Sequence, residues 1–362
     1  TISSMNWNVS DPYNGGLEIF STGQDKKIIL KNSVFNHLIQ IKNHANDITI
    51  TNNTFYNCSK IQQADGDNLT FEDNFIFNTT TDVSIRYSGH NGSFRNNHFE
   101  DFDRPDTNGA IHILGDNTLI SNNSFINMTQ ANTIIGTYGE SRNISISNNY
   151  ILNPQNFGIA LFGSGGYINI SFNQLDNVSQ GIWGKGENVT ISHNILNKCG
   201  WNPNPGYAGG CITVAGGGQE TRQDNITVIN NTINNAVEVA FMTGTADREW
   251  GNLTFSNNHI NNSRYGIFLT TSGAIYRPDN FTIIENNFSN IIIVVTNYVE
   301  YSNKMGDNFL FKGNTIWNST NGFDIAGTSL TYKNFTVLNN TLHVNETAFD
   351  FSEMDGVVIR NN

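Results

Sequence analysis

A short motif recurs along almost the whole chain of 362 residues. It reads Asn, then apolar–polar–apolar, then a paired polar turn that usually contains Asn-Asn, as in NDITITNNTF (46–55), RNISISNNYI (142–151) and KNFTVLNNTL (333–342). A repeat of about 20 to 30 residues is the signature of a solenoid, in which each unit buries its apolar face against its neighbours. The repeat therefore favours one domain over the two or three that the length alone allows. The second residue of the turn pair is expected at Asn53, Asn74, Asn97, Asn123, Asn149, Asn173, Asn194, Asn231, Asn258, Asn287, Asn314, Asn340 and Asn362, with Asn32 in the same position of an earlier copy.

Each repeat contains three short runs in which apolar and polar residues alternate, as is typical of β-strands with one buried face. In residues 143–163 these runs are 144–146, 150–152 and 158–162. Strands this short do not form a stable hairpin alone, so neighbouring copies have to stack. We therefore predict an all-β solenoid of about 13 or 14 coils, with three parallel sheets and an interior of Ile, Leu, Val and Phe.

Asn is the dominant polar residue, with 61 copies against 33 Gly. It is a poor helix former and favours turns, which argues against a helical protein. At a sharp bend between two strands, an Asn amide can bond to unpaired backbone groups and to its copy one coil away. Each such bond contributes about 1 kcal/mol net. An internal Asn ladder therefore accounts for nearly all of the Asn.

This pattern resembles the right-handed parallel β-helix of the pectate-lyase-like superfamily, with its internal Asn ladder, over residues 26–362. Within that superfamily, the Asn-rich repeats of low charge are similar to those of archaeal cell-surface proteins of the disaggregatase type. The resemblance implies an extracellular or cell-surface enzyme that degrades a chondroitin-like matrix. Residues 1–25 lack the repeat and are expected to form an N-terminal cap. Because the last unit, GVVIRNN (356–362), stops at its turn, we expect the chain to continue beyond it or to pair there.

Charge and composition exclude two classes of partner. The net charge is -12, with a sequence pI near 5.0, which argues against a nucleic-acid binder. No run approaches the roughly 18 apolar residues of a membrane-spanning helix.

The three Cys are too few for a disulfide framework. Cys199 and Cys211 flank a long loop that a disulfide would staple, whereas the equivalence of Cys58 to Cys199 within the repeat favours simple burial.

Seven insertions interrupt the repeat next to its third strand, and insertions in solenoids often form the binding face. Two of them, 100–109 and 198–210, enter that strand. The other five leave it: 137–143, 215–224, 243–252, 270–280 and 296–308. We expect a groove with the third strands as its floor and the insertions as its walls.

Alternation along the third strand predicts which side chains face this groove. Exposed aromatic side chains suit stacking on sugar rings, unless the wall loops simply cover them.

Eight of the nine Arg lie between residues 86 and 277, and Arg binds carboxylates in a bidentate way. We therefore predict an acidic, uronate-containing polysaccharide as the ligand, with scattered surface ion pairs as the alternative. The predicted outward positions are Arg86, His112, Ile135, Ala160, Phe162, Trp183, Lys185, Thr213, Glu238, Phe268, Asp324 and Asp350. The candidate substrate-binding residues are Trp183, Phe162, Phe268, Trp201, Arg86, Arg104 and Lys185.

Two reaction types fit such a groove. Hydrolysis needs two carboxyl groups across the scissile bond, and the candidates are Glu238, the only carboxylate predicted on the central floor, and Asp247. The alternative for Glu238 is a surface ion pair with Arg264. β-Elimination needs a base and a cation that neutralises the uronate carboxylate. The candidate bases are His112, Tyr138 and Tyr276, and the candidate neutralising residues are Arg222, Arg248, Arg264 and Arg277.

No cofactor is expected to be required. Asp101, Asp103 and Asp106 resemble a loose Ca²⁺ loop, but Arg104 lies among them and the Gly of an EF-hand is missing. The sequence therefore predicts no defined metal-ligand set. A non-catalytic cell-surface scaffold or sugar-binding module is the alternative to an enzyme.

Overall fold

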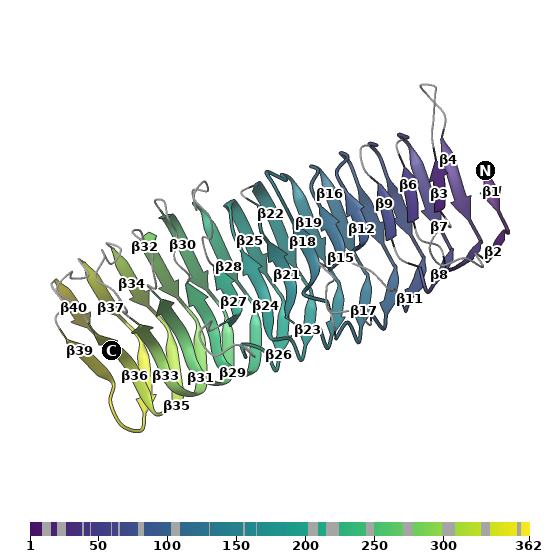
Figure 1. Ribbon diagram of the computed structural model, residues 1–362. Helices are drawn as coiled ribbons and strands as arrows, with labels where there is room; N and C mark the ends of the chain where they lie inside the picture. The colour runs from purple at the N-terminus through teal and green to yellow at the C-terminus, as the bar shows by residue number, and fades with distance from the viewer. Residues whose placement is uncertain are drawn as a thin grey trace. The chain divides into compact units, whose positions relative to one another are not determined.

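The computed structural model describes residues 1–8, 16–19, 27–37, 40–43, 45–58, 60–63, 66–78, 83–102, 109–129, 131–154, 156–163, 165–201, 209–214, 224–243, 250–270, 278–298, 308–326, 334–352 and 356–362. The chain divides into two compact units, Thr1–Leu175 and Asp176–Asn362. In each unit, parallel strands from successive coils lie side by side (Figure 1). The described residues contain β-strands and turns without an α-helix, and none of their segments is a helix able to cross a membrane. The prediction of an all-β, right-handed parallel β-helix is confirmed.

The first unit repeats one path: a first strand, a sharp turn, a second strand and then a third strand. We call the three stacks of equivalent strands the first, second and third ladders. The first ladder contains β1 (Ile2–Ser3), β4 (Ile28–Lys31), β7 (Ile48–Thr51), β10 (Thr70–Glu72), β13 (Ser93–Arg95), β16 (Thr118–Ser121), β19 (Ile144–Ser147) and β22 (Gly166–Ser171). The second contains β2 (Asn6–Asn8), β5 (Val34–Asn36), β8 (Thr54–Tyr56), β11 (Phe75–Phe77), β14 (His98–Glu100), β17 (Ser124–Ile126) and β20 (Tyr150–Leu152). The third contains β3 (Gly16–Ile19), β6 (Gln40–Asn43), β9 (Lys60–Gln63), β12 (Val83–Tyr87), β15 (Gly109–Ile113), β18 (Thr133–Thr137) and β21 (Phe157–Leu161).

The segment expected to form a cap supplies β1, β2 and β3. These strands pair in parallel with β4, β5 and β6, respectively. The described part of residues 1–25 therefore has the same three-strand arrangement as the coils that follow it.

The second unit has the same three ladders, but three of its strands are long. Strands β29 (Thr232–Thr243), β31 (His259–Thr270) and β33 (Asn287–Tyr298) run without a break from the second ladder into the third. The second and third ladders therefore join into one sheet here, whereas three separate sheets were predicted. The remaining strands are β23 (Gln174–Asp176, which begins two residues before this unit), β24 (Gln180–Gly184), β25 (Glu187–Ser192), β26 (Ile195–Asn197), β27 (Gly210–Val214), β28 (Ile226–Ile229), β30 (Trp250–Ser256), β32 (Pro278–Ile284), β34 (Phe309–Lys312), β35 (Thr315–Ser319), β36 (Asn321–Ala326), β37 (Phe335–Leu338), β38 (Thr341–Val344), β39 (Phe349–Ser352) and β40 (Val357–Arg360).

Apolar side chains at the inward positions fill the interior of each unit. In the first unit the rings of Phe35 and Phe55 stack at 5.1 Å, and those of Phe55 and Phe71 at 6.1 Å. All three are fully buried. Identical inward positions stack coil on coil, because the parallel register pairs Phe35 with Phe55 directly. The alternation in the sequence therefore translates directly into the core.

A buried Asn ladder follows the turn between the first and second strands. The backbone N–H of Asn97 donates to Oδ1 of Asn123 at 2.9 Å, and that of Asn123 donates to Oδ1 of Asn149 at 3.0 Å. The Asn123 side-chain amide also donates to the Phe94 carbonyl oxygen. The predicted ladder is confirmed, with two corrections of phase. The ladder positions of the first unit are Ser33, Asn53, Asn74, Asn97, Asn123, Asn149 and Asn173, and those of the second are Asn194, Asn231, Asn258, Asn286, Asn314, Asn340 and the exposed Asn362, so Ser33 replaces Asn32 and Asn286 replaces Asn287.

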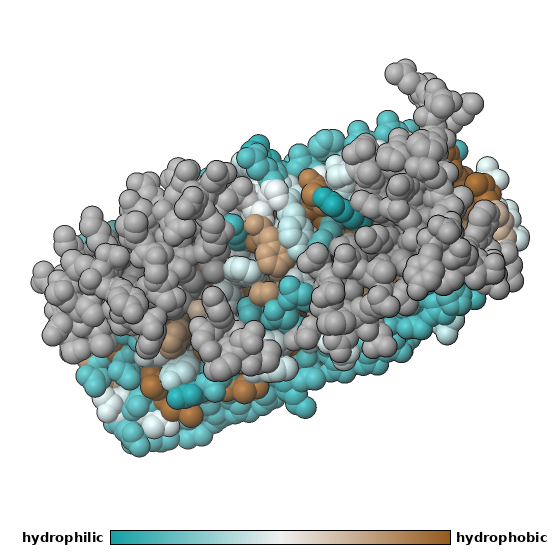
Figure 2. Space-filling view, viewed as in Figure 1, coloured by the Kyte–Doolittle hydropathy of each residue, from teal (hydrophilic) through white to brown (hydrophobic). Residues whose placement is uncertain are grey.

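Most other Asn residues have a second role. In a typical coil, Asn117, Asn122 and Asn127 have φ values of 54°, 56° and 54°. Asn tolerates this left-handed conformation better than most residues, because its short polar side chain can hydrogen-bond locally. Exposed amides also bond from coil to coil, as Asn143 does to Asn117 at 2.9 Å. The single internal ladder thus explains only part of the Asn content. On the face drawn in Figure 2, hydrophilic residues accordingly cover much of the described surface, with apolar residues in separate patches.

Candidate functional site

The third ladder of the first unit presents one row of outward positions. The parallel register aligns Gln62, Arg86, His112, Gly136 and Ala160. This confirms the outward positions predicted for Arg86, His112 and Ala160. The prediction for Ile135 is wrong, because Ile135 pairs with inward residues on both sides and is fully buried.

An aromatic cluster lies over this row. The Tyr138 ring is 4.5 Å from the His112 ring and 4.9 Å from the Phe162 ring, measured between centroids. The Tyr138 hydroxyl lies 3.5 Å from Nε2 of His112. Gly136 gives the ring its space, because a Cβ there would come within 2.9 Å of Cε2 of Tyr138. The structure thus brings together three residues that were predicted separately as base or sugar-binding candidates.

Backbone hydrogen bonds fix the two residues that follow the strands. The Tyr138 N–H donates to the Ile113 carbonyl oxygen at 2.8 Å, and the Phe162 N–H donates to the Thr137 carbonyl oxygen at 2.9 Å. Each residue is therefore held one position beyond the end of its strand, against the preceding coil. Tyr138 and Phe162 are half-buried.

The electrostatics of the cluster favour a neutral phenol. Burial raises the pKa of Tyr138 to about 12. The hydroxyl is therefore protonated at neutral pH and can donate a proton. His112 beside it is only 6% exposed. Arg86, one coil earlier in the same row, is exposed and lies next to His112 in the register. A proton donor, an imidazole and a cation thus lie next to one another on one strand face, which we call the His–Tyr site.

The second unit has its own outward row on the third ladder. It contains Trp183, Thr213, Met242, Phe268, Thr296, Asp324 and Asp350. This confirms the outward positions predicted for Trp183, Thr213, Phe268, Asp324 and Asp350. Trp183 and Phe268 are half-buried, so part of each ring remains accessible. Lys185 follows β24 and is 6% exposed, and burial lowers its pKa.

Glu238 is not in this row. The register of β29 shifts between Ala236 and Val239, so Met242 takes the outward position and Glu238 lies at the corner before it. Its carboxylate forms an ion pair with Arg264 at 3.0 Å, and both side chains are about half exposed. The Arg264 guanidinium in turn lies over the Tyr265 ring, 4.9 Å from its centroid. The prediction that Glu238 lies on the floor is wrong, and the ion pair is the arrangement that was considered as its alternative.

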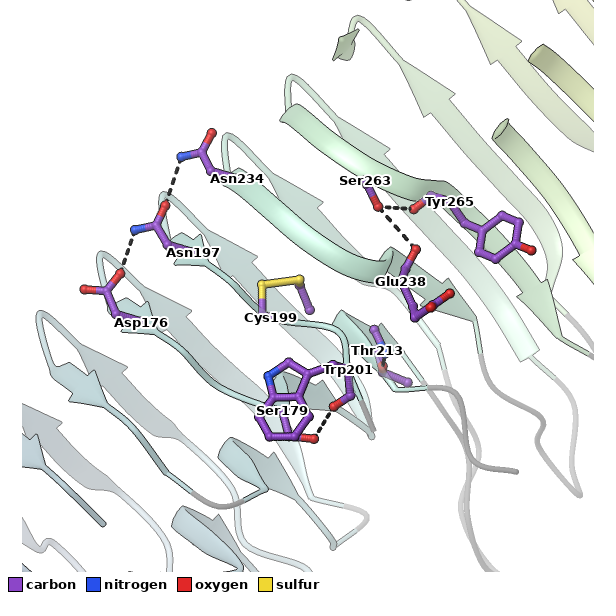
Figure 3. The surroundings of a disulfide bond; sticks show 12 residues. Asp176, Ser179, Asn197, Cys199, Trp201, Thr213, Asn234, Glu238, Ser263 and Tyr265 are labelled. Carbon is purple, nitrogen blue, oxygen red and sulfur yellow. Dashed lines mark hydrogen bonds between the residues drawn. A yellow bond between two sulfur atoms is a disulfide. The ribbon is translucent and has the colours of Figure 1, made fainter. Parts of the chain in front are cut away.

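A disulfide joins Cys199 and Cys211 in the second unit, where the sequence had left simple burial open (Figure 3). Their Cα atoms are 5.0 Å apart. Trp201 lies beside it, and its carbonyl oxygen accepts a hydrogen bond from the Ser179 hydroxyl. Trp201 is half-buried. Cys58 is a free, buried thiol.

Several predicted residues lie outside the described part of the chain. They are Arg104, Arg222, Asp247, Arg248, Tyr276 and Arg277, together with Asp103 and Asp106 of the Ca²⁺ loop hypothesis. The described residues contain no group of three or more His, Cys, Asp or Glu able to hold a metal ion. Most of each predicted wall loop is also outside the described residues, whereas 137–143 is described throughout.

Sequence reasoning missed the role of Gly136. The signal was a Gly inside the β-type run TIIGT (133–137), where a residue without a side chain marks a bulge or a close approach. Here the close approach is that of the Tyr138 ring.

Comparison with known proteins supports the fold. Residues 105–250 match a family described as a right handed beta helix region. No curated protein matches the sequence. A solved PL6 alginate lyase in complex with a trisaccharide is 15% identical, with a TM-score of 0.60 over 95% of this chain and 89% of that one. A second alginate lyase, in complex with G6, is 14% identical, with a TM-score of 0.57 over the same shares of the two chains. At this identity the similarity shows the fold alone. Both of these neighbours are alginate lyases, and neither is a disaggregatase.

Proposed function

We propose that this protein cleaves glycosidic bonds of an acidic, uronate-containing polysaccharide by β-elimination at the His–Tyr site. The observation that carries the proposal is the contact between the Tyr138 hydroxyl and Nε2 of His112, with Arg86 next to His112 in the same row. Elimination needs a base, a proton donor and a positive charge. In the proposal His112 is the base, Tyr138 is the proton donor and Arg86 supplies the positive charge. The row from Gln62 to Ala160 contains no carboxylate, which does not favour hydrolysis by a pair of carboxyl groups.

The proposed reaction moves one proton from carbon to oxygen. Arg86 binds the uronate carboxylate and makes the neighbouring proton on C5 more acidic. The neutral His112 imidazole removes that proton, the C5–H electron pair forms a C4=C5 double bond, and the C4–O bond breaks. The Tyr138 phenol donates its proton to the departing oxygen. The His112 imidazolium then returns a proton to the Tyr138 phenolate across their 3.5 Å contact, which restores the starting state. Such contacts often tighten only when substrate is bound.

Phe162 supports the binding of a sugar ring. Its ring continues the surface formed by Tyr138, at a centroid distance of 4.9 Å, and part of it is exposed. Aromatic faces of this kind suit the apolar face of a pyranose. We propose an extracellular or cell-surface location, which the disulfide between Cys199 and Cys211 supports, because disulfides persist in oxidising compartments.

The test is turnover on a panel of polymers: alginate, polygalacturonate and chondroitin. Release of reducing ends together with the ultraviolet absorbance of an unsaturated uronide is the expected result on at least one of them. Tyr138→Phe should lower turnover by about 10²- to 10⁴-fold, the usual contribution of a positioned acid or base. Glu238→Gln is the matched control, because Glu238 lies outside the outward row and should leave turnover unchanged. Circular dichroism of both variants checks that the fold is intact.

Three results would contradict the proposal. Release of reducing ends without the unsaturated product means hydrolysis. Loss of turnover in Glu238→Gln but not in Tyr138→Phe moves the chemistry to the corner that holds Glu238 and Arg264. No release from any uronate polymer favours a non-catalytic cell-surface scaffold or sugar-binding module.

A further inference from the structure

A hollow of about 670 Å³ opens on the first unit at the ends of strands in the second ladder. It is formed where β8, β11, β14 and β17 run into the following turns. The His–Tyr site lies on the third ladder, on strands that start after these turns. The hollow therefore belongs to a different ladder from the site of the proposed reaction.

One wall of the hollow is aromatic. Tyr56 and Phe77 are directly paired in the parallel register, and their rings meet edge to face at 5.0 Å. The Phe77 ring also contacts the exposed Phe75 ring at 5.5 Å. Tyr56 is 38% exposed and Phe75 is 44% exposed. The packed core lies on the other face of these strands, so burial in the core does not account for Tyr56 and Phe77 in the lining.

The other groups that line the hollow are hydrogen-bonding side chains. Glu100 follows Phe77 in the same outward row, and the exposed Asp101 comes directly after it. Asn78 and Asn127 line the hollow from the neighbouring coils on either side. Carboxylates and amides are acceptors and donors for hydroxyl groups. A hollow that combines aromatic faces with such groups matches a sugar, which has an apolar C–H face and a rim of hydroxyls.

The charges in the hollow select against an acidic sugar. Two carboxylates, those of Glu100 and Asp101, line it, and its described lining contains neither Lys nor Arg. A uronate placed here would bring a third negative charge to the two already present, and like charges at short range repel. The nearby His98 is paired with Glu100 at 3.1 Å. The chemistry of the hollow therefore differs from that of the His–Tyr site, where Arg86 supplies a positive charge.

We propose that this hollow is a second carbohydrate-binding site, which takes a neutral oligosaccharide and has no part in cleavage. The sugar ring stacks on Tyr56 and Phe77, and its hydroxyls bond to Glu100, Asp101 and the two Asn amides. A protein that cleaves an acidic polymer at one site can in this way hold a neutral polymer at another. The proposal stands whether or not the His–Tyr site is catalytic.

The experiment is titration calorimetry of the full chain with three neutral probes: cellohexaose, mannohexaose and xylohexaose. At least one is expected to bind. The double variant Tyr56→Ala/Phe77→Ala should weaken that binding by about tenfold or more, because truncation of aromatic anchors typically costs at least this much. Tyr150→Ala is the matched control, since Tyr150 lies in the same ladder but does not line the hollow.

Two further measurements separate this site from the His–Tyr site. Binding of the neutral hexaose should be unchanged by a saturating oligouronate, and competition between them would overturn the assignment of separate sites. Glu100→Gln/Asp101→Asn removes both negative charges, so an oligouronate should then bind in the hollow. This binding should be lost when Tyr56 is also changed to Ala, and it should not occur in the wild type. Absence of binding by all three neutral probes, or equal binding by the aromatic double variant, would refute the proposal.

Discussion

The ring of Tyr138 lies directly against Gly136, where a Cβ would come within 2.9 Å of ring atom Cε2. Gly136 occupies the outward position between His112 and Ala160. Any other residue there would push the phenol away from its place beside His112. The geometry of the His–Tyr site therefore depends on a residue that has no functional group of its own.

Gly136→Ala should lower turnover by about tenfold or more, because displacement of a reacting group by about 1 Å can cost a factor of 10². Stability should change much less, since the Tyr138 ring is half-buried and can move outward. The measurements are turnover number and melting temperature. Ala160→Gly, a change at the next position of the same row, is the control and should retain activity. Wild-type turnover in Gly136→Ala would show that the position of Tyr138 is not important.

Tyr138 should make stability depend on pH in the alkaline range. Burial raises its folded-state pKa to about 12, above the ordinary tyrosine pKa of about 10. Because the pKa is raised on folding, its contribution to stability is fully present below pH 10 and is lost as the pH rises through about 12. Tyr138→Phe should therefore lose less stability than the wild type between these pH values. Thermal unfolding at a series of pH values checks this, with Tyr167→Phe at an exposed phenol as the control. Parallel pH curves for wild type and Tyr138→Phe would contradict it.

Removal of one buried amide should disrupt the Asn ladder. Asn123 is 1% exposed and bonds to Asn97, Phe94 and Asn149. Asn123→Ala leaves buried donors and acceptors without partners, at a cost of about 2–4 kcal/mol. Denaturant unfolding measures this change. Asn169→Ala is the control, because the exposed Asn169 side chain hydrogen-bonds to Ser171 in its own strand and is not part of the ladder. An effect below about 0.5 kcal/mol, as for an ordinary surface residue, would show that the ladder adds little to stability.

Two aromatic residues, Tyr167 and Phe172, occupy positions where Asn is usual. Phe172 has a φ of 57° and is 57% exposed, whereas Asn148 holds the equivalent position one coil earlier with a φ of 55°. Since a left-handed conformation costs ordinary residues about 1–2 kcal/mol and Asn less, Phe172→Asn should stabilise the fold by about 0.5–1 kcal/mol. Asn148→Phe should destabilise it by a similar amount. A fall in melting temperature for Phe172→Asn would mean that contacts of the ring outweigh the backbone strain.

Loss of the disulfide should destabilise the second unit. Cys199 and Cys211 are 12 residues apart in the sequence, and closing such a loop stabilises a fold by about 2–4 kcal/mol. Cys199→Ala/Cys211→Ala should therefore lower the melting temperature. A reducing agent should have the same effect on the wild type and none on the double variant. An equal fall in the melting temperature of both proteins would show that the reducing agent does not act through this disulfide.

The fold was predictable from alternation and turn chemistry, down to most buried Asn positions. The two errors of phase share one cause. In KNSVF (31–35) and ENNF (285–288) the ladder residue was assigned from the Asn residues of the turn pair. Its position is instead determined by the inward residue of the second strand. Phe35 and Phe288 are those inward residues, and the ladder residue lies two positions before each, at Ser33 and Asn286. Anchoring the repeat on the buried aromatic would have corrected both.

The site was predictable only in part. Alternation identified Arg86 and His112 because β12 and β15 are regular strands. It failed at Glu238 because Met242, four residues further along β29, is the residue that aligns with Thr213 and Phe268, whereas Glu238 lies where the register of β29 shifts between Ala236 and Val239. The contact between His112 and Tyr138 joins two coils and depends on a turn residue. Periodicity within one strand carries no information about such a contact.

The left-handed residues recur at a constant interval of five, as at Asn117, Asn122 and Asn127 and again at Asn188, His193 and Lys198. The next set, Asn225, Asn230 and Asn235, keeps that interval even though 37 residues separate Asn188 from Asn225. The lengths of the coils thus vary only outside this fixed frame. New segments can accordingly be exchanged beside the third ladder while the rest of the coil keeps its pairing, so the architecture separates the evolution of specificity from that of stability.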